Sequence, residues 1–432
     1  MIAEGLATDI GLASSVAARL GITVRVTPSF PGAARFADAV EVGLRRNPKR
    51  AQLLVSRVLG KHIPVPVGQA LAAAQTLGSR VRAACAGQTP VVIGFAETAT
   101  GLGHGVAAVC AADGGPAPCL HTTRRPAPPA ARVVRFSEEH SHATDQALVL
   151  NDDGGLAANR PLVLVDDELT TGQTVFNAIR AIHAIWPRDA YVLASLIDCR
   201  DDEQRSELAR SVRGLGAECV SVCLLDGSVR VPADAVAAVS DFAESLPAGT
   251  PRPGRAYPAP VRWLDVALPP GVPPVAAGGL GRLQQLAAIA AMSRLASSLP
   301  VAGDRRTLVI GDEELMYLPQ LLALALGDEV RTSTTSRTPA IALDEPGYPL
   351  RTALSFPSTQ DGRRPVRAYN VAPSGHARPG NAPGFDHLVL VTDAERGPKT
   401  AGVVAELAAN ARRDVHVISL HRGATGESCA AG

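Results

Sequence analysis

The segment that most constrains the fold runs from Pro161 to Thr174 and reads PLVLVDDELTTGQT. It begins with an apolar run of strand length that ends abruptly in two adjacent carboxylates, Asp166 and Asp167. A loop of Thr and Gly residues then leads into a helix. Carboxylates can accept hydrogen bonds from the neighbouring hydroxyls of a sugar, and free N–H groups at the start of a helix can hold a phosphate. The segment therefore predicts a sugar-phosphate site at the end of a strand.

Predicted strands and helices alternate on both sides of this segment. The strands are expected at residues 22–26, 51–55, 90–94, 131–136, 191–197 and 219–225. The helices are expected at residues 10–20, 35–46, 67–86, 175–185, 204–215 and 233–246. This order is typical of a parallel sheet flanked by helices, and it predicts an α/β fold.

The chain is too long for a single hydrophobic core, because 432 residues usually divide into two or three domains. Residues 248–279 are dense in Pro and Gly, which predicts a linker or an extended segment packed against one domain. We therefore expect a first domain at residues 1–247 and a second, smaller Rossmann-like α/β domain at residues 280–432. In the second domain we expect a helix at 280–299 and strands at 307–310, 330–332 and 387–391.

Charge and composition argue against several classes of function. The 42 basic and 41 acidic residues give a net charge of +1, and the sequence has no basic block or basic-aromatic pattern typical of nucleic-acid binding. No apolar run reaches membrane-spanning length, and the N-terminus lacks a signal-peptide pattern. The seven cysteines are scattered, and we expect reduced thiols. The sequence predicts a cytoplasmic protein that binds neither nucleic acid nor membrane.

A second polar loop follows the strand expected at residues 90–94. It reads FAETATGLGHG over residues 95–105, and a helix is expected from Val106. A strand, a loop of Gly and small polar residues, and a helix form the layout of an anion-binding turn. The glycines alternate, so they do not match the Gly-x-Gly-x-x-Gly fingerprint of dinucleotide-binding folds.

Three interpretations compete for the segment at 161–174. A receiver domain also carries paired acids at a strand end, but on its first strand, whereas several β/α units precede the pair here. A purely structural interpretation takes Asp167 or Glu168 as a helix cap and Gly172 as a turn residue. A cap needs one such residue, whereas this loop packs adjacent acids, three Thr and a Gly together. Binding of ribose 5-phosphate is the third interpretation, and we favour it.

Residues 162–174 resemble the signature of type I phosphoribosyltransferases, which bind 5-phosphoribosyl-1-diphosphate (PRPP). The resemblance implies that Asp166 and Asp167 hold the 2′- and 3′-hydroxyls of the ribose. It also implies that the 5′-phosphate is held by the loop that follows, with Glu168, Thr170, Thr171, Gly172, Gln173 and Thr174. Mg²⁺ is the implied cofactor, held mainly through PRPP near the two aspartates.

Four further segments narrow the resemblance, namely residues 47–50, 54–64, 94–101 and 136–143. They are similar to the phosphoribosyltransferases encoded in bacterial tellurite-resistance and stress-response operons, which carry a C-terminal domain named for a Thr-Arg-Ser-Pro (TRSP) motif. The corresponding residues 334–339 read Thr-Thr-Ser-Arg-Thr-Pro, so the order is altered. This resemblance implies transfer of a phosphoribosyl group to an unidentified base-like or other small acceptor, with release of pyrophosphate. It further implies a nucleoside-like product, and we expect a homodimer.

The resemblance also assigns the remaining candidates in the first domain. The loop that receives the pyrophosphate is expected at Ala96, Glu97, Thr98, Ala99, Thr100 and Gly101. The catalytic or lid candidates are Arg57, Lys61, His62, Arg124, Arg125, Glu139, His140 and His142. The last three could instead bind a metal, but a second ligand cluster is lacking in their neighbourhood of the sequence.

Polar residues also follow three predicted strands of the second domain. Because the carboxyl ends of parallel strands share the edge of a sheet where ligands bind, the second domain is expected to have a site of its own. Its candidates are Asp312, Glu313, Glu314, Arg337 and Asp393. Two alternatives stay open: a non-catalytic regulator that senses PRPP, or a bifunctional enzyme whose second domain acts as a hydrolase or phosphatase.

Overall fold

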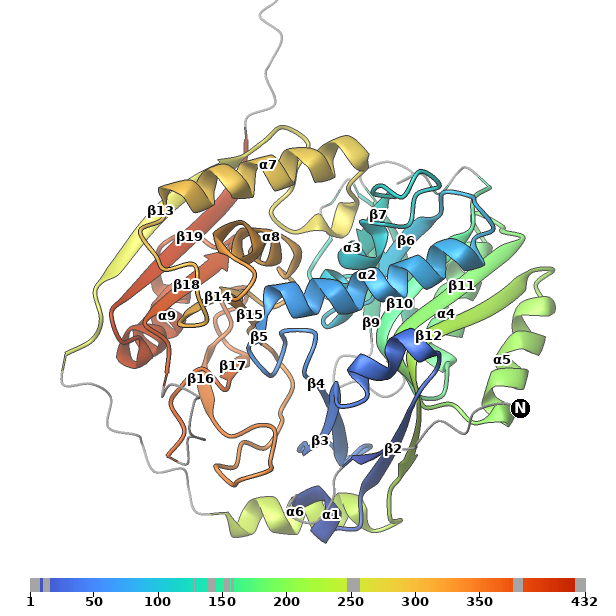
Figure 1. The fold of residues 1–432 in the computed structure, drawn as a ribbon, viewed down its shortest axis with the longest axis horizontal. Helices are drawn as coiled ribbons and strands as arrows, with labels where there is room; N and C mark the ends of the chain where they lie inside the picture. Colours follow the sequence, from blue (N-terminus) through green and yellow to red (C-terminus); the bar gives the residue numbers. More distant parts are fainter. Residues whose placement is uncertain are drawn as a thin grey trace, which may run out of the picture.

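The computed structural model describes residues 8–10, 16–127, 129, 131–137, 145–150, 156, 159–246, 257–375 and 384–423. Two β-sheets lie side by side, and each is flanked by helices (Figure 1). The α/β fold predicted from the alternation of strands and helices is therefore confirmed. None of the helices in the described ranges combines the length and the apolar character that a membrane span requires.

The first sheet has seven strands in the order β1-β2-β12-β11-β10-β6-β7. These strands are β1 (Thr8–Ile10), β2 (Thr23–Pro28), β6 (Val91–Gly94), β7 (Cys119–His121), β10 (Leu162–Leu169), β11 (Ala190–Asp198) and β12 (Glu218–Arg230). From β12 to β7 neighbouring strands pair in parallel, whereas β1 and β2 form an antiparallel edge. The strand with the acidic pair, β10, lies between β11 and β6 in the parallel part.

Alternate residues of β10 face different layers of helices, as expected of a strand that is buried on both faces. The helices of this half are α1 (Val16–Arg19), α2 (Val67–Ala84), α3 (Ala99–Ala107), α4 (Gln173–His183), α5 (Asp202–Arg213) and α6 (Ala235–Ser245). Val163 and Val165 share a core with α2 and α3, whereas Leu162 and Leu164 share one with α4 and α5. Packing on both faces thus fixes the carboxyl end of β10.

The second sheet has six strands in the order β13-β19-β18-β14-β15-β5. These strands are β5 (Val65–Pro66), β13 (Val261–Leu268), β14 (Thr307–Gly311), β15 (Arg331–Thr334), β18 (His387–Thr392) and β19 (Asp414–Arg422). All neighbours pair in parallel except β5, an antiparallel edge strand contributed by the N-terminal half. This strand therefore joins the two halves through their backbones.

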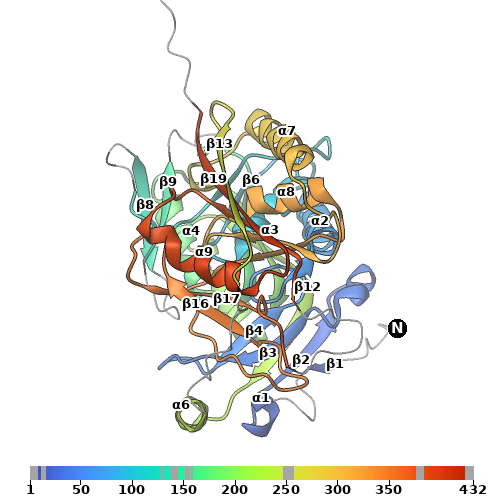
Figure 2. The ribbon, with the colours of Figure 1, turned by 90° about the vertical axis from the view of Figure 1, so that its left-hand side faces the viewer.

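Helices cover both faces of the second sheet as well. Helices α7 (Arg282–Ser298) and α8 (Tyr317–Leu326) share one core with Val309 and Val389, whereas α9 (Pro398–Asn410) shares another with their strand neighbours. In Figure 2 this half faces the viewer, with α9 in front of the sheet. The remaining elements are the hairpins β3 (Val40–Leu44) with β4 (Gln52–Ser56), β8 (Arg132–Ser137) with β9 (Asp145–Leu150) and β16 (Ala353–Pro357) with β17 (Pro365–Tyr369), and the 3-10 helices η1 (Pro31–Phe36) and η2 (Ala276–Gly278).

Several predicted elements differ from the structure. The helix predicted at residues 35–46 is wrong, because the segment ends the 3-10 helix η1 and then forms strand β3, whose pairing with β4 buries Val40, Val42 and Leu44 on alternate positions. The segment predicted as a linker, residues 248–279, contains the strand β13, which pairs in parallel with β19. Its Pro- and Gly-rich flanks hide this strand from an argument based on composition. The expected domain boundaries themselves stay a prediction.

Helix α3 begins at Ala99 rather than at Val106, so Gly101, Gly103 and Gly105 lie inside a helix and not in a loop. All three are buried, and their lack of side chains lets α3 approach its neighbours closely. A Cβ atom on Gly103 would lie 2.9 Å from the Cα atom of Gly94 on β6, whereas one on Gly101 would meet Gln320 of α8 and one on Gly105 would meet Ala74 of α2. Gly103 therefore serves packing against the sheet, and the other two serve packing against helices.

We expect Gly94→Ala to lower the free energy of unfolding by roughly 1–3 kcal/mol or more, the usual range for forcing an atom into a packed core. The new Cβ atom would lie 2.3 Å from the carbonyl oxygen of Ala99, which only a shift of α3 can relieve. Urea denaturation measures the effect. Gly397→Ala is the control, because a Cβ atom there meets nothing within 4 Å. Equal stability of the two variants would contradict the close approach.

The two halves are held together by hydrogen bonds between segments far apart in the sequence. The Tyr348 hydroxyl accepts a hydrogen bond from the amide of Leu44 (2.9 Å), and the Asn370 side-chain amide donates to the carbonyl oxygen of His62 (3.0 Å). Arg331 donates to the carbonyl oxygen of Pro64 (2.7 Å).

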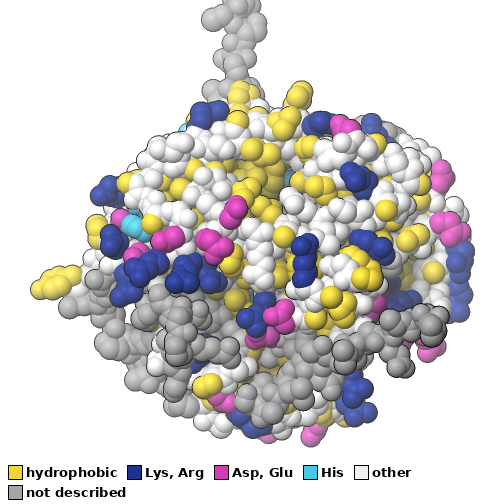
Figure 3. All heavy atoms as spheres, in the orientation of Figure 1, with side chains coloured by type: hydrophobic (Ala, Val, Ile, Leu, Met, Phe, Trp, Pro, Cys, Tyr) yellow, Lys and Arg dark blue, Asp and Glu magenta, His cyan; other side chains and the backbone are white. Residues whose placement is uncertain are grey.

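On the molecular face in Figure 3, Lys and Arg side chains are interspersed with Asp and Glu.

Candidate active site

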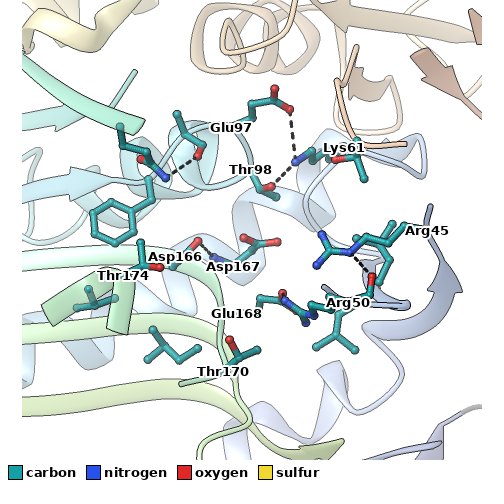
Figure 4. A pocket seen from close by; sticks show the side chains of 18 of the residues that line it. Arg45, Arg50, Lys61, Glu97, Thr98, Asp166, Asp167, Glu168, Thr170 and Thr174 are labelled. Carbon is teal, nitrogen blue, oxygen red and sulfur yellow. Dashed lines mark hydrogen bonds and ion pairs between the residues drawn. The ribbon is translucent and has the colours of Figure 1, made fainter. Parts of the chain in front are cut away.

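A cavity of about 160 Å³ opens at the carboxyl end of β10. Its wall combines the loop after β10, the loop after β6, the β3–β4 hairpin and a segment of the C-terminal half. It is lined by Arg45, Arg50, Leu53, Leu54, Lys61, His62, Phe95, Ala96, Glu97, Thr98, Arg124, Gln146, Asp166, Asp167, Glu168, Leu169, Thr170, Thr171, Gly172, Thr174, Val175, Arg337 and Thr338. Figure 4 shows the acids near the carboxyl end of β10 on one side of this cavity and Lys61 with Glu97 on another.

The loop after β10 turns directly into α4. Gly172 has φ +84°, a left-handed conformation that suits glycine, and α4 begins at the next residue, Gln173. Gly172 has no side chain to cap this helix start, and the amide of Gln173 donates a hydrogen bond to Oγ1 of Thr171 (3.3 Å). The N–H groups that follow Gln173 are the ones available to an anion in the cavity.

The acids at the end of β10 are partly buried and have different partners. The amide of Asp167 donates a hydrogen bond to Oδ1 of Asp166 (2.9 Å). Burial, followed by the charge of Glu168, raises the pKa of Asp167, and Lys61 opposes this effect. Glu168, predicted with the phosphate loop, forms an ion pair with Arg50 (2.5 Å). The hairpin segment that carries Arg50 is thus tied to the phosphate loop.

The predicted pyrophosphate loop divides into two parts. Ala96, Glu97 and Thr98 line the cavity, whereas Ala99, Thr100 and Gly101 begin helix α3 and are buried beneath it. The residues that line the cavity include two, Glu97 and Thr98, that contact the cation Lys61. Lys61 donates a hydrogen bond to Oγ1 of Thr98 (2.5 Å), and its Nζ lies 3.6 Å from Oε2 of Glu97 (Figure 4).

Glu97 is a buried carboxylate surrounded by cations. Burial, the largest effect, raises its pKa, but Lys61, Arg124 and Arg337 together lower it below the usual value. Ser336 donates a hydrogen bond to Oε2 (3.3 Å), while Oε1 has no hydrogen-bond partner among the described atoms. Three cations therefore surround one point of the cavity wall, and one of them, Arg337, comes from the C-terminal half of the chain.

The lid candidates separate in the structure. Lys61, His62 and Arg124 line the cavity, and burial lowers the pKa of His62 so that its ring is neutral near pH 7. Arg57 does not line it, since its exposed side chain pairs with Glu41 (2.8 Å) on the β3–β4 hairpin. Arg125 donates a hydrogen bond to Asp393 of the C-terminal half. Glu139, His140 and His142 lie outside the described residues.

Arg45, Arg50, Leu53 and Leu54 line the cavity although no role was predicted for them. Arg50 belongs to the segment at 47–50, and the resemblance of this segment to the family is a signal that could have identified Arg50 as a site residue. Arg45 follows β3, in a segment that helical spacing assigned to a helix, so nothing in the pattern pointed to it.

The acidic candidates of the C-terminal half are held at the junction of the two halves. Asp312 is buried and accepts hydrogen bonds from Thr359 (2.5 Å) and Thr392 (2.7 Å); burial, followed by the charge of Glu313, raises its pKa to about 6. Glu313 pairs with Arg337. Asp393 also lines a wider, open hollow at the carboxyl ends of β13, β18 and β19. The candidates therefore lie near the first-half cavity, and Arg337 reaches it.

The described residues contain no cluster of three or more His, Cys, Asp or Glu side chains that could hold a metal ion by itself. Mg²⁺ usually takes one or two carboxylates, and substrate phosphates and waters fill its other positions. Asp166 and Asp167 both line the cavity and offer such carboxylates. The residues present thus fit a Mg²⁺ ion that binds together with a phosphorylated ligand.

Comparison with known proteins identifies both halves. Residues 39–228 match the family described as phosphoribosyl transferase, and residues 279–407 match the TRSP domain described as C-terminal to it. None of the curated proteins matches the chain significantly.

Similar solved structures include three phosphoribosyltransferases. The adenine phosphoribosyltransferase of Trypanosoma brucei, in complex with AMP, pyrophosphate and ribose-5-phosphate, is 12% identical with a TM-score of 0.33, over 46% of this chain and 80% of that one. That of Rhodothermus marinus is 15% identical with a TM-score of 0.32, over 44% and 97%. A hypoxanthine phosphoribosyltransferase of Staphylococcus aureus is 13% identical with a TM-score of 0.23, over 33% and 68%.

The two family matches follow one another in the order predicted from the sequence and contain most strands of both sheets, whereas β1, β2, β13 and β19 lie outside the matched ranges. The chain therefore carries a phosphoribosyl transferase domain, a domain of glycosyltransferase-type enzymes, followed by the TRSP domain that is C-terminal to it.

Proposed function

We propose that the protein transfers the 5-phosphoribosyl group of PRPP to a base-like small molecule and releases pyrophosphate. One observation carries this proposal: a single cavity has paired carboxylates and a Thr/Gly helix start on one side, and a cluster of cations on another. PRPP presents hydroxyls, a 5′-phosphate and a pyrophosphate, so each part of the donor has a complementary group in the wall.

The acids and the loop after β10 would hold the ribose 5-phosphate part of the donor. Asp166 and Asp167 would accept hydrogen bonds from the 2′- and 3′-hydroxyls. The N–H groups at the start of α4, with Thr170, Thr171 and Thr174, would bind the 5′-phosphate. Arg50 would hold the hairpin against this loop through its ion pair with Glu168.

In the transfer step, the bond between the anomeric carbon and the pyrophosphate oxygen breaks, a bond from the attacking atom of the acceptor to the same carbon forms, and the proton on that atom is released to solvent. The electron pair of the broken bond leaves with pyrophosphate, so positive charge develops on the ribose ring and negative charge on the leaving group. The two aspartates would stabilise the ring, and Lys61 would stabilise the leaving group. Mg²⁺, when bound, would neutralise part of the pyrophosphate charge.

The β3–β4 hairpin would form the wall that faces the acceptor. Leu53 and Leu54 offer apolar side chains suited to the face of a flat base, and the neutral ring of His62 can donate or accept a hydrogen bond. The similarity to enzymes of tellurite-resistance and stress-response operons supports a nucleoside-like product. A homodimer in the cytoplasm remains part of this proposal.

The experiment is a turnover assay with the purified full chain, Mg²⁺, radiolabelled PRPP and a panel of nucleobases and related heterocycles. We expect pyrophosphate release that depends on one class of acceptor, and a ribosylated product of matching mass. Tight PRPP binding without release by any acceptor would favour a PRPP sensor. Orthophosphate release from the ribosylated product would favour a phosphatase activity of the second domain.

A further inference from the structure

We propose that the C-terminal domain is a structural part of the transfer site, and that Arg337 of this domain binds the pyrophosphate group of PRPP. This inference rests on the phosphoribosyl transfer proposed above and assigns the pyrophosphate subsite to both halves of the chain. It also assigns Glu314 as the residue that positions Arg124 for the same group.

Arg337 follows strand β15 and reaches the cavity of the first half. Its side chain is 17% exposed, and its Nε lies 3.8 Å from Oε1 of Glu97, on the wall that Lys61 also faces. The same Nε donates a hydrogen bond to Glu313, which also pairs with Nη2 of Arg337 and accepts a hydrogen bond from Ser358 (2.5 Å). Arg337 is therefore held by its own domain beside Glu97 of the other domain.

Arg124 belongs to the first half, but its backbone is held by the second. The amide of Arg124 donates a hydrogen bond to Oε1 of Glu314 (2.7 Å), and the hydroxyl of Thr123 donates to Oε2 (2.5 Å). The next residue, Arg125, donates to Asp393 (2.6 Å). Acids of the C-terminal half thus fix a three-residue segment of the first half at the edge of the cavity.

Three cations, Lys61, Arg124 and Arg337, surround the single carboxylate of Glu97. Arg337 is also paired with Glu313, but three cationic side chains still converge on this part of the cavity wall, which suits a strongly anionic ligand group. The pyrophosphate of PRPP is such a group. Without the second domain Arg337 would be missing and Arg124 would lose its anchor, so Lys61 alone would remain from the first half.

The proposal predicts that substitution of Arg337 changes the affinity for some ligands and not for others, because Arg337 lies beside Glu97 and not beside the loop after β10. The test measures the binding of PRPP, inorganic pyrophosphate and ribose 5-phosphate to the full chain in the presence of Mg²⁺, by calorimetry. We expect Arg337→Ala to weaken PRPP and pyrophosphate about tenfold to a hundredfold, the range for losing a charged hydrogen bond, and to change ribose 5-phosphate less than twofold.

Matched variants separate this role from a role in folding. Arg364→Ala removes an exposed arginine of the same domain, paired with Asp361, and should leave all three affinities unchanged. The double variant Glu313→Gln/Arg337→Gln removes both charges of the clamp together, so that no unpaired charge stays buried, and should show the same split as Arg337→Ala. Glu314→Gln should weaken PRPP and pyrophosphate by a smaller factor, again without affecting ribose 5-phosphate.

Equal weakening of all three ligands, or of none, in both Arg337 variants would overturn the inference. A wild-type chain that binds ribose 5-phosphate and PRPP equally well would overturn it too, because the pyrophosphate would then have no subsite. If the wild-type chain binds neither ligand, the proposed function fails, and this inference fails with it.

Discussion

Replacing Asp166 and Asp167 together by alanine is expected to lower the affinity for PRPP by about a hundredfold to ten-thousandfold. Each carboxylate would lose a charged hydrogen bond to a ribose hydroxyl, and such bonds contribute roughly 1.5–3 kcal/mol each, with about 1.4 kcal/mol per factor of ten. Both residues line the cavity at the carboxyl end of the central strand β10. Calorimetry with Mg²⁺ and PRPP measures the change.

The double alanine variant should remain folded. Burial and the charge of Glu168 raise the pKa of Asp167, so the charged form of this residue lowers the stability of the folded state at neutral pH. Removing it should therefore leave the melting temperature unchanged or higher. Asp202→Ala/Glu203→Ala is a matched control, since it removes an adjacent acid pair that is exposed at the start of α5. Unchanged PRPP affinity in the Asp166/Asp167 variant would contradict the assignment of the ribose subsite.

Pyrophosphate binding gives this prediction a second readout. The two aspartates should matter for ribose 5-phosphate and little for pyrophosphate, whereas Arg337 should show the opposite preference. Such a crossed pattern is difficult to produce by general loss of structure, which would weaken every ligand.

The central loop could be predicted from the sequence because its signal is local. An apolar strand, two acids, a Thr/Gly loop and a helix follow one another within Leu162–Thr174, and the structure places them in that order on β10 and α4. The prediction of a helix at 35–46 was wrong because the local signal there is ambiguous. The apolar residues of this segment fit both a period of two and a helical spacing, and only the pairing of β3 with β4 decides between them.

The junction of the two halves could not be predicted, because its contacts are long-range. Ser336 and Glu97 are hydrogen-bonded although they lie 239 positions apart, and Thr123 and Glu314 lie 191 apart. The sequence marks Glu97, Glu314 and Arg337 as candidates, but it does not show the contacts that join their segments. The sequence shows which polar residues lie at the end of a strand. The partner of each such residue depends on how the two sheets pack, which the sequence does not show.

Lys61→Ala is expected to reduce the rate of pyrophosphate release from PRPP by about a hundredfold to a thousandfold, the usual effect of removing one group that stabilises developing charge. Lys61 is buried, donates a hydrogen bond to Thr98 (2.5 Å), and lies 3.6 Å from Glu97. Stopped-flow or coupled detection of pyrophosphate measures the rate. Lys61→Met keeps the length of the side chain without its charge and should be equally slow, whereas the exposed Lys399→Ala should have the wild-type rate. A wild-type rate for Lys61→Met would contradict the role of the charge.

The same substitution should change how stability depends on pH. Lys61, with Arg124 and Arg337, lowers the pKa of Glu97 in spite of the opposing effect of burial. A carboxyl whose pKa is lowered on folding adds stability above its ordinary pKa, and this contribution is lost as pH falls through the lowered value. The loss of stability in Lys61→Met should therefore be largest near neutral pH and shrink in acid. Adding Glu97→Gln should restore the stability at neutral pH, because it removes a buried carboxylate that has lost one of its cationic neighbours. It should not restore the rate of pyrophosphate release. Recovery of both would mean that Lys61 acts only as the partner of Glu97 in the folded protein.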